Sequence, residues 1–150
     1  MDRVEIGTKL FKEGYNCCQA VVGAFIDLLP IGSDSAMKLA SPFGAGIGRL
    51  REVCGAVSGM MMVAGFLFGN SDRKLESKGD TYALAQKLAE KFKAINGKSI
   101  VCKELLGLTG KEDPKPSERT DDYYKKRPCV MLVQDAIKVL LEEMEERNML

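Results

Sequence analysis

The feature that most constrains this chain is a segment of 19 residues without a charged side chain, VCGAVSGMMMVAGFLFGNS, from Val53 to Ser71. An apolar segment of about 20 residues is long enough to cross a bilayer. A helix that is apolar on all sides also occurs in the core of a soluble bundle. Four glycines and two serines dilute the segment, and the chain contains only one such stretch. We therefore expect a buried central helix and no membrane span.

Glycines recur four residues apart in this segment, at Gly55 and Gly59 and again at Gly65 and Gly69. Small residues at that spacing allow a second backbone to approach a helix closely. The approaching backbone can belong to the same chain or to a second copy of it. A homodimer is therefore one expectation for the assembly.

The remainder of the chain carries the start and stop signals of amphipathic helices. Asn16 is a favourable N-cap, Pro30 stops the helix that follows it, and Asn96-Gly97 closes a long amphipathic helix. The polar residues 107–122 include two prolines and predict an exposed loop. The predicted helices cover residues 2–13, 16–29, 36–40, 53–68, 81–95, 99–107 and 128–147.

The pattern of apolar residues also indicates the fold class. No segment alternates apolar and polar residues with the period of two that a half-buried strand requires. A chain of 150 residues fits one ordinary domain. The sequence therefore predicts an all-α fold, a single-domain helical bundle over residues 1–150 around the glycine-rich helix.

Composition excludes several classes of function. The chain contains no histidine, which removes Ser-His-Asp and Cys-His catalysis and also zinc or haem ligated by histidine. The 22 Lys and Arg residues against 21 Asp and Glu give a net charge of +1. No overall field therefore attracts nucleic acid or an anionic membrane surface, and we expect neither as a partner.

Five cysteines, at positions 17, 18, 54, 102 and 129, carry the chemical signal. An odd number does not suit the disulfide framework of a secreted domain. The N-terminus is charged from Asp2 onward and lacks the apolar region of a signal peptide. We therefore expect a cytoplasmic protein, in whose reducing compartment cysteines indicate metal binding or redox chemistry more than structural disulfides.

Four of these cysteines fall at the predicted start of a different helix. Cys17 follows the Asn16 cap, Cys54 opens the glycine-rich helix, Cys102 lies in the first turn after Ser99, and Cys129 follows Pro128. Unpaired N–H groups and the positive end of the helix dipole favour a thiolate there. We therefore expect lowered thiol pKa values and enhanced reactivity at these four positions.

Two further observations bear on whether the cysteines form one site. The four lie 37, 48 and 27 positions apart, so they match no local zinc or ferredoxin motif. Any shared site must be assembled by folding. Cys18 points about 100° away from Cys17 around the helix, and we expect it to be buried and inert. Four separately buried cysteines in an ordinary bundle remain the alternative.

Several motifs carry a resemblance to a known family. They are FKEGYNCCQAV at 11–21, FGAGIG at 43–48, CGAVSG at 54–59, CKELLG at 102–107 and Pro128-Cys129-Val130. In this order they resemble the redox-active proteins named for a C…CGAxxG…C…C pattern (C_GCAxxG_C_C). The resemblance spans nearly the whole chain. It implies redox activity from Cys17, Cys54, Cys102 and Cys129, leaves Cys18 outside the site and names no substrate.

Two mechanisms use four thiolates, and a third role needs no redox chemistry. The four cysteines can ligate an iron–sulfur centre that passes single electrons, or act in pairs as a metal-free thiol–disulfide oxidoreductase. A Cys₄ zinc ion would make the protein a metal-binding module. Because the positions are scattered and no CxxC pair is present, we expect the iron–sulfur centre, with Cys17, Cys54, Cys102 and Cys129 as its ligands and as the reactive residues. The partner is then a redox protein or a small redox substrate.

Other motifs receive simpler interpretations. The glycine-rich residues 44–49 lack the lysine of a phosphate loop and predict a tight turn that passes close to the start of the Cys54 helix. We expect Arg49 and Arg51 to be a solvated pair, although they can also stabilise an anionic cluster. The basic aromatic run at 123–127 predicts a surface segment that can gate access to Cys129.

Overall fold

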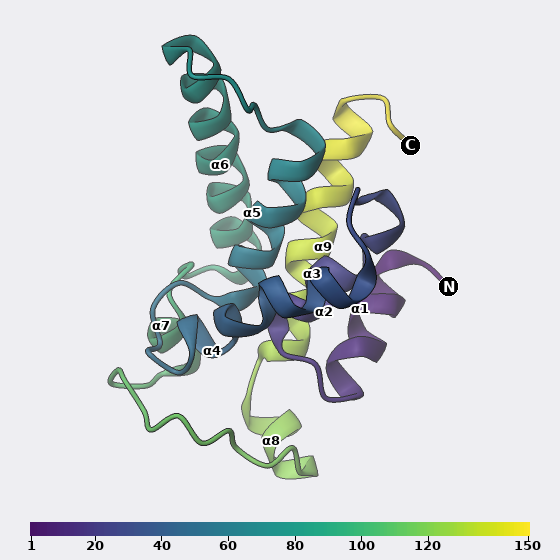
Figure 1. Ribbon diagram of the computed structural model, residues 1–150. Helices are drawn as coiled ribbons and strands as arrows, with labels where there is room; N and C mark the ends of the chain where they lie inside the picture. Colours follow the sequence, from purple (N-terminus) through teal and green to yellow (C-terminus); the bar gives the residue numbers. More distant parts are fainter.

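The structure is a computed structural model that describes residues 1–150, except for the side chains of residues 125 and 126. It is all-α, as the sequence predicts (Figure 1). Within the described residues the only strand-like pairing is a single antiparallel bridge between Val53 and Val101. The elements are α1 (Arg3–Lys12), α2 (Cys17–Gly23), η1 (Ile26–Leu28), α3 (Ser33–Ala40), η2 (Ser41–Phe43), α4 (Gly44–Ile47), α5 (Gly55–Phe68), α6 (Leu75–Asn96), α7 (Cys102–Leu106), α8 (Asp121–Lys126) and α9 (Cys129–Glu146).

The short helix α2 lies at the centre of the bundle, where it packs against α1, α3, α5 and α9. Every α2 residue except Gln19 is buried. The glycine-rich helix α5 is buried along its first turns but leaves Gly65 and Phe66 exposed. The expectation that α5 is buried on all sides is therefore wrong. Its 14 residues extend beyond the seven of α2, so its C-terminal end lacks that cover.

The two glycine pairs of α5 differ in what they contact. A Cβ atom added at Gly59 would lie 2.8 Å from the Cys18 carbonyl oxygen and 3.0 Å from Val21 Cβ, so glycine is what lets α2 approach. A Cβ added at Gly65 would meet nothing within 4 Å, and one at Gly69 would meet only atoms of Gly65. The predicted close approach therefore holds for Gly55 and Gly59 and is wrong within this chain for the second pair.

Local capping explains where several helices begin and end. The Asn16 side chain accepts the Gln19 N–H (2.9 Å), and the Gln19 side chain accepts the Asn16 N–H (3.0 Å), which forms a capping box at α2. Gly97 ends α6 in the left-handed conformation, at φ +72°. These two boundaries agree with the sequence prediction.

Three boundaries differ from the prediction. α2 ends at Gly23 rather than near residue 29, because Arg3 donates to the Ala24 carbonyl (2.9 Å) and the chain tightens into η1. α6 begins at Leu75, six residues before the predicted start. α8 begins at Asp121, within the last two residues of the predicted loop, where the Thr120 hydroxyl accepts the Tyr123 N–H (3.2 Å) as an N-cap.

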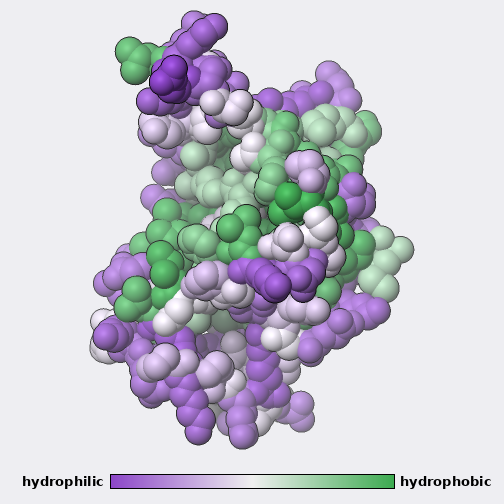
Figure 2. Space-filling model, in the orientation of Figure 1, coloured by the Kyte–Doolittle hydropathy of each residue, from purple (hydrophilic) through white to green (hydrophobic). Residues whose placement is uncertain are grey.

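The faces of the bundle differ in polarity. In Figure 2 apolar surface gathers over the middle of the molecule, between two hydrophilic ends, and the lower end carries the 107–120 loop and α8. None of the helices in the described part of the chain combines the length and apolar character that crossing a bilayer needs. The four cysteines of interest lie next to the hydrophilic lower end, because α7 and α8 are found there.

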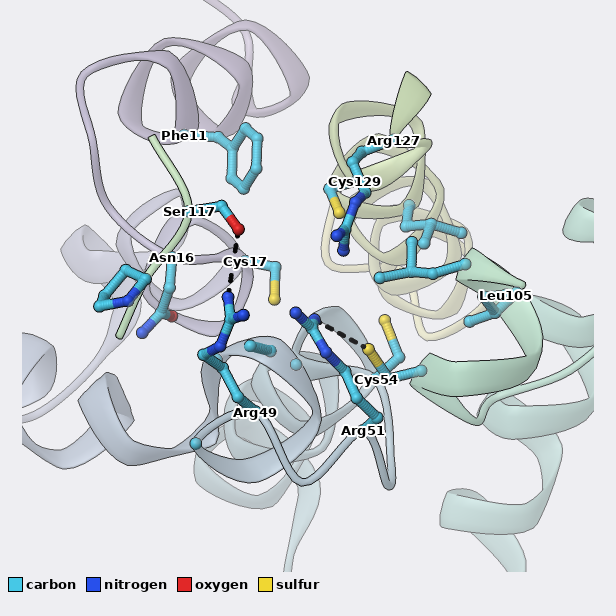
Figure 3. Close-up of a pocket in the computed structure, with 18 of the residues that line it drawn as sticks. Phe11, Asn16, Cys17, Arg49, Arg51, Cys54, Leu105, Ser117, Arg127 and Cys129 are labelled. Carbon is cyan, nitrogen blue, oxygen red and sulfur yellow. Dashed lines mark hydrogen bonds between the residues drawn. The ribbon is translucent and has the colours of Figure 1, made fainter. Parts of the chain in front are cut away.

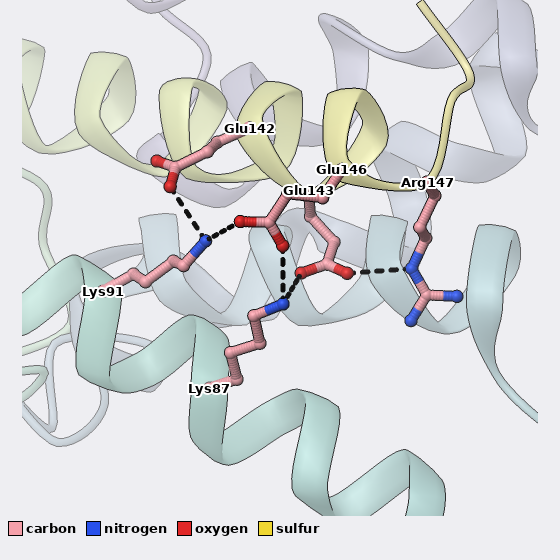
Figure 4. Close-up of polar contacts among 6 residues, drawn as sticks. All are labelled: Lys87, Lys91, Glu142, Glu143, Glu146 and Arg147. Carbon is pink, nitrogen blue, oxygen red and sulfur yellow. Dashed lines mark hydrogen bonds and ion pairs between the residues drawn. The ribbon is translucent and has the colours of Figure 1, made fainter.

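Ion pairs join the long helices α6 and α9 (Figure 4). Lys87 bonds Glu143 (2.9 Å) and Glu146 (2.7 Å), while Lys91 bonds Glu142 and Glu146 at 2.9 Å each. Glu143 is only 3% exposed, so its partners compensate the cost of burying a carboxylate.

Candidate four-cysteine site

The four cysteines predicted to share a site line one pocket of about 310 Å³ (Figure 3). Cys17, Cys54 and Cys102 are buried, whereas Cys129 is half-buried, and none of them forms a disulfide. Folding thus brings together residues that are tens of positions apart in the sequence. Cys18 does not line the pocket and is fully buried, with its Sγ atom 3.9 Å from Met62 Sδ.

Each of the four cysteines starts a helix, as the sequence predicts. Cys17, Cys102 and Cys129 are the first residues of α2, α7 and α9. Cys54 is the residue directly before α5. The first-turn N–H groups of a helix have no partner within that helix. At α5 such groups reach the Cys54 sulfur atom, whereas at α7 the first two donate to the carbonyls of Glu52 and Arg51.

A short backbone pairing fixes Cys54 beside Cys102. The Cys54 N–H donates to the Ile100 carbonyl (2.8 Å), and the Cys102 N–H donates to the Glu52 carbonyl (2.6 Å). These two bonds flank the bridge between Val53 and Val101. The sequence analysis missed this pairing, because a bridge of this length leaves no periodic pattern.

The glycine-rich residues 44–49 form the left-handed turn that borders the pocket. Residues 45–49 all have positive φ, at 57°, 67°, 66°, 54° and 70°. Non-glycine residues pay about 1–2 kcal/mol each for this conformation, and such strain is found at functional sites. A Cβ added at Gly55 would lie 3.2 Å from Gly44 Cα, and one added at Gly46 would lie 2.7 Å from Cys102 Cβ. The predicted close turn beside the Cys54 helix is confirmed.

Arg51 is a buried cation in direct contact with one of the cysteines. Its side chain is 4% exposed, its Nη1 atom lies 3.6 Å from Cys102 Sγ, and its Nη2 atom lies 2.5 Å from a Glu112 carboxylate oxygen. Arg49 Nη2 reaches the same carboxylate at 3.5 Å. The expectation of a solvated pair is therefore wrong, because Glu112 and Cys102 draw Arg51 into the pocket wall. The alternative, that these arginines face an anionic group, agrees with the geometry.

Burial dominates the acid–base behaviour of the sulfur atoms. It raises the pKa of Cys17, and the Ala45 N–H only partly opposes it. Burial and the neighbouring Cys17 raise the pKa of Cys54 well above its usual value, despite the N–H groups of Ala56 and Val57. Burial, with the nearby Cys17, raises the pKa of Cys129 to about 11. The predicted lowering is therefore wrong for these three thiols.

The basic aromatic run completes the pocket wall. Tyr123 and Arg127 line the pocket, and Arg127 lies 5.7 Å from the Tyr123 ring centroid. Burial raises the pKa of Tyr123 to about 12, and the adjacent Cys129 adds to the effect. The predicted surface segment is thus part of the site where it is described. The side chains of residues 125 and 126 lie outside the described part of the chain, and so does the prediction for them.

The donor set can be compared with what a metal requires. Among the described residues, no three or more Cys, Asp or Glu side chains are placed to hold one metal ion. This finding applies to a single zinc ion and to an iron–sulfur centre alike. The donor types are different evidence: the pocket wall supplies four cysteines and, among its described residues, no carboxylate. A set of cysteines alone is what an iron–sulfur centre uses.

Comparison with known proteins gives one match. Residues 15–143 match the family described as "Putative redox-active protein (C_GCAxxG_C_C)". The matched range begins just before Cys17 and ends after Cys129, so it contains all four cysteines of the pocket. No curated protein and no solved structure matches the chain.

Proposed function

Because this chain belongs to the C_GCAxxG_C_C family, whose description is that of a redox-active protein, we propose that it transfers electrons through an iron–sulfur centre held by Cys17, Cys54, Cys102 and Cys129. The observation that carries the proposal is the convergence of these four side chains on one pocket. Its described wall offers no carboxylate that competes with them, and the chain has no histidine. Such a centre supplies one-electron chemistry.

The chain's own groups prepare the sulfur atoms for the ligand role. Burial keeps Cys17, Cys54 and Cys129 as thiols at neutral pH, so these residues release protons when they bind a metal as thiolates. Backbone N–H groups near Cys17 and Cys54, together with the Arg51 guanidinium at Cys102, then stabilise the thiolate charge. Positive charge at the sulfur atoms favours the reduced state, so Arg51 raises the reduction potential.

One contact favours a second candidate function, thiol–disulfide exchange without a metal. Arg51 Nη1 lies 3.6 Å from Cys102 Sγ, so a cation stands beside this sulfur atom. Cys102 would attack a substrate disulfide as the nucleophile and release one substrate thiol. A second pocket thiol would then attack the mixed disulfide and release the other thiol. Two protein thiols become one disulfide, and the substrate disulfide becomes two thiols, which take up the protons.

Anaerobic purification followed by iron, zinc and sulfide analysis separates these functions. The proposal predicts iron and acid-labile sulfide bound to the wild-type protein, with visible absorption that bleaches on reduction. Cys54→Ser should lose both, whereas Cys18→Ser, the matched control outside the pocket, should keep them. Iron-free protein that loses thiols two at a time on oxidation would support the second candidate. Bound zinc without iron would contradict both functions. Equal behaviour of the two variants would contradict the choice of ligands.

A further inference from the structure

The pocket that contains the cysteines is also lined by cations. Its wall includes four arginines, Arg49, Arg51, Arg119 and Arg127, and no described aspartate or glutamate. In Figure 3 the guanidinium groups of Arg49, Arg51 and Arg127 turn toward the space near Cys17 and Cys129. Glu112 lies behind Arg49 and Arg51 and pairs with both. The single negative charge of Glu112 is thus shared between two of the four arginines.

Arg119 is held in position by contacts with uncharged groups. Its guanidinium donates to the carbonyl oxygens of Phe11 and Tyr15, the latter at 2.7 Å, and lies 4.0 Å from the Phe11 ring centroid. Carbonyl oxygens and an aromatic face orient a guanidinium but do not neutralise it. A cation fixed in this way loses little conformational entropy when it binds an anion.

Arg127 is the most available of the four cations. Among the described residues it makes no ion pair, and its guanidinium lies 5.7 Å from the Tyr123 ring centroid and close to Cys129. A guanidinium has five N–H donors in a planar fork that suits the two oxygens of a carboxylate or phosphate. Arg127 therefore has donors that remain free for a ligand.

The pocket keeps an excess of positive charge even if the proposed iron–sulfur centre is present. Four arginines against Glu112 leave three positive charges at the pocket. A four-cysteine iron–sulfur centre carries about two net negative charges, which still leaves a positive excess. Uncompensated charge in a partly buried pocket is costly unless an anion binds there.

We propose that the pocket binds a small organic or inorganic oxyanion, a carboxylate or a phosphate, through Arg127 and Arg119 next to the four cysteines. The volume of about 310 Å³ suits a small molecule rather than a protein segment. Phe11, Leu105 and Leu132 add apolar wall for the body of such a ligand. The proposal goes beyond electron transfer by naming the class of small molecule that the cysteine site receives.

Calorimetric titration tests the proposal with two probes, inorganic phosphate and succinate, at constant ionic strength set with sodium chloride. We expect saturable binding of at least one probe to the wild-type protein, and the stronger probe identifies the anion class. Arg127→Gln should weaken binding about tenfold, the effect of one charge-assisted pair. Arg73→Gln, which removes an exposed arginine outside the pocket, should bind as the wild type does.

Two further variants separate a loss of anion binding from misfolding and from loss of the metal centre. Arg127→Lys retains the charge and should weaken binding less than Arg127→Gln does. Cys54→Ser, even without bound iron, should still bind the probe, so a failure of the iron–sulfur proposal is distinguished from a failure of this one. The proposal is overturned if neither probe saturates, or if Arg73→Gln and Arg127→Gln weaken binding equally.

Discussion

Gly55→Ala tests whether the close approach of Cys17 to the start of α5 is real. The added methyl group would overlap Cys17 Sγ, and it would lie 2.8 Å from the Phe43 carbonyl oxygen and 3.2 Å from Gly44 Cα. Two of these three neighbours are backbone atoms, so rotation of a side chain does not relieve the clash. Overpacking of this kind costs roughly 1–3 kcal/mol.

The matched control is Gly65→Ala on the same helix, where the new methyl group meets nothing within 4 Å. Replacing an exposed helical glycine by alanine stabilises by roughly 0.5–1 kcal/mol. Urea unfolding followed by circular dichroism, under reducing conditions, should therefore show the two variants on opposite sides of the wild type. For a chain of this length, each 1 kcal/mol corresponds to about 2–4 °C in melting temperature. If Gly55→Ala stabilises as much as Gly65→Ala does, the packing of the pocket described above is wrong.

Three further predictions concern other parts of the molecule. Arg51→Met should lower the free energy of unfolding by roughly 1–3 kcal/mol in urea, because it removes the closer of the two cations that pair with the half-buried Glu112 carboxylate; unchanged stability would contradict this. Cys18→Ala should leave iron content unchanged and cost about 1 kcal/mol for a small cavity, and loss of iron would place Cys18 in the site. Burial opposes the charge of Glu143, but Lys87 and Arg147 outweigh it and lower its pKa. Stability from that carboxylate is therefore present above its unfolded pKa and is lost as the pH falls below about 4.5. Glu143→Gln should flatten this acid loss in urea titrations, and an unchanged pH profile would refute it.

Local signals in the sequence predicted much of the fold. The capping residues Asn16, Gly97 and Pro128 act within one helical turn, so the helix boundaries next to them were predictable. The end of α2 was not predictable, because Arg3, which lies on another helix, donates a hydrogen bond to the Ala24 carbonyl. The early start of α6 was also missed: the predicted helix begins at residue 81, but Gly79 already lies inside the observed helix.

The convergence of four cysteines on one pocket agrees with the sequence prediction, whereas the electrostatics of that pocket do not. The four cysteines could be chosen because each one precedes or opens a helix. Their raised pKa values follow from burial in a pocket that only the folded chain defines. The position of Arg51 depends on Glu112, which is 61 residues away, so no local pattern indicated that this arginine is buried.

The most direct test of the account is a crystal structure of anaerobically purified protein, with anomalous diffraction measured at the iron edge. The account predicts one iron–sulfur centre per chain, with the sulfur atoms of Cys17, Cys54, Cys102 and Cys129 as its protein ligands and Cys18 turned toward Met62. Iron bound by any other set of side chains, or four cysteines that do not face a common pocket, would contradict it.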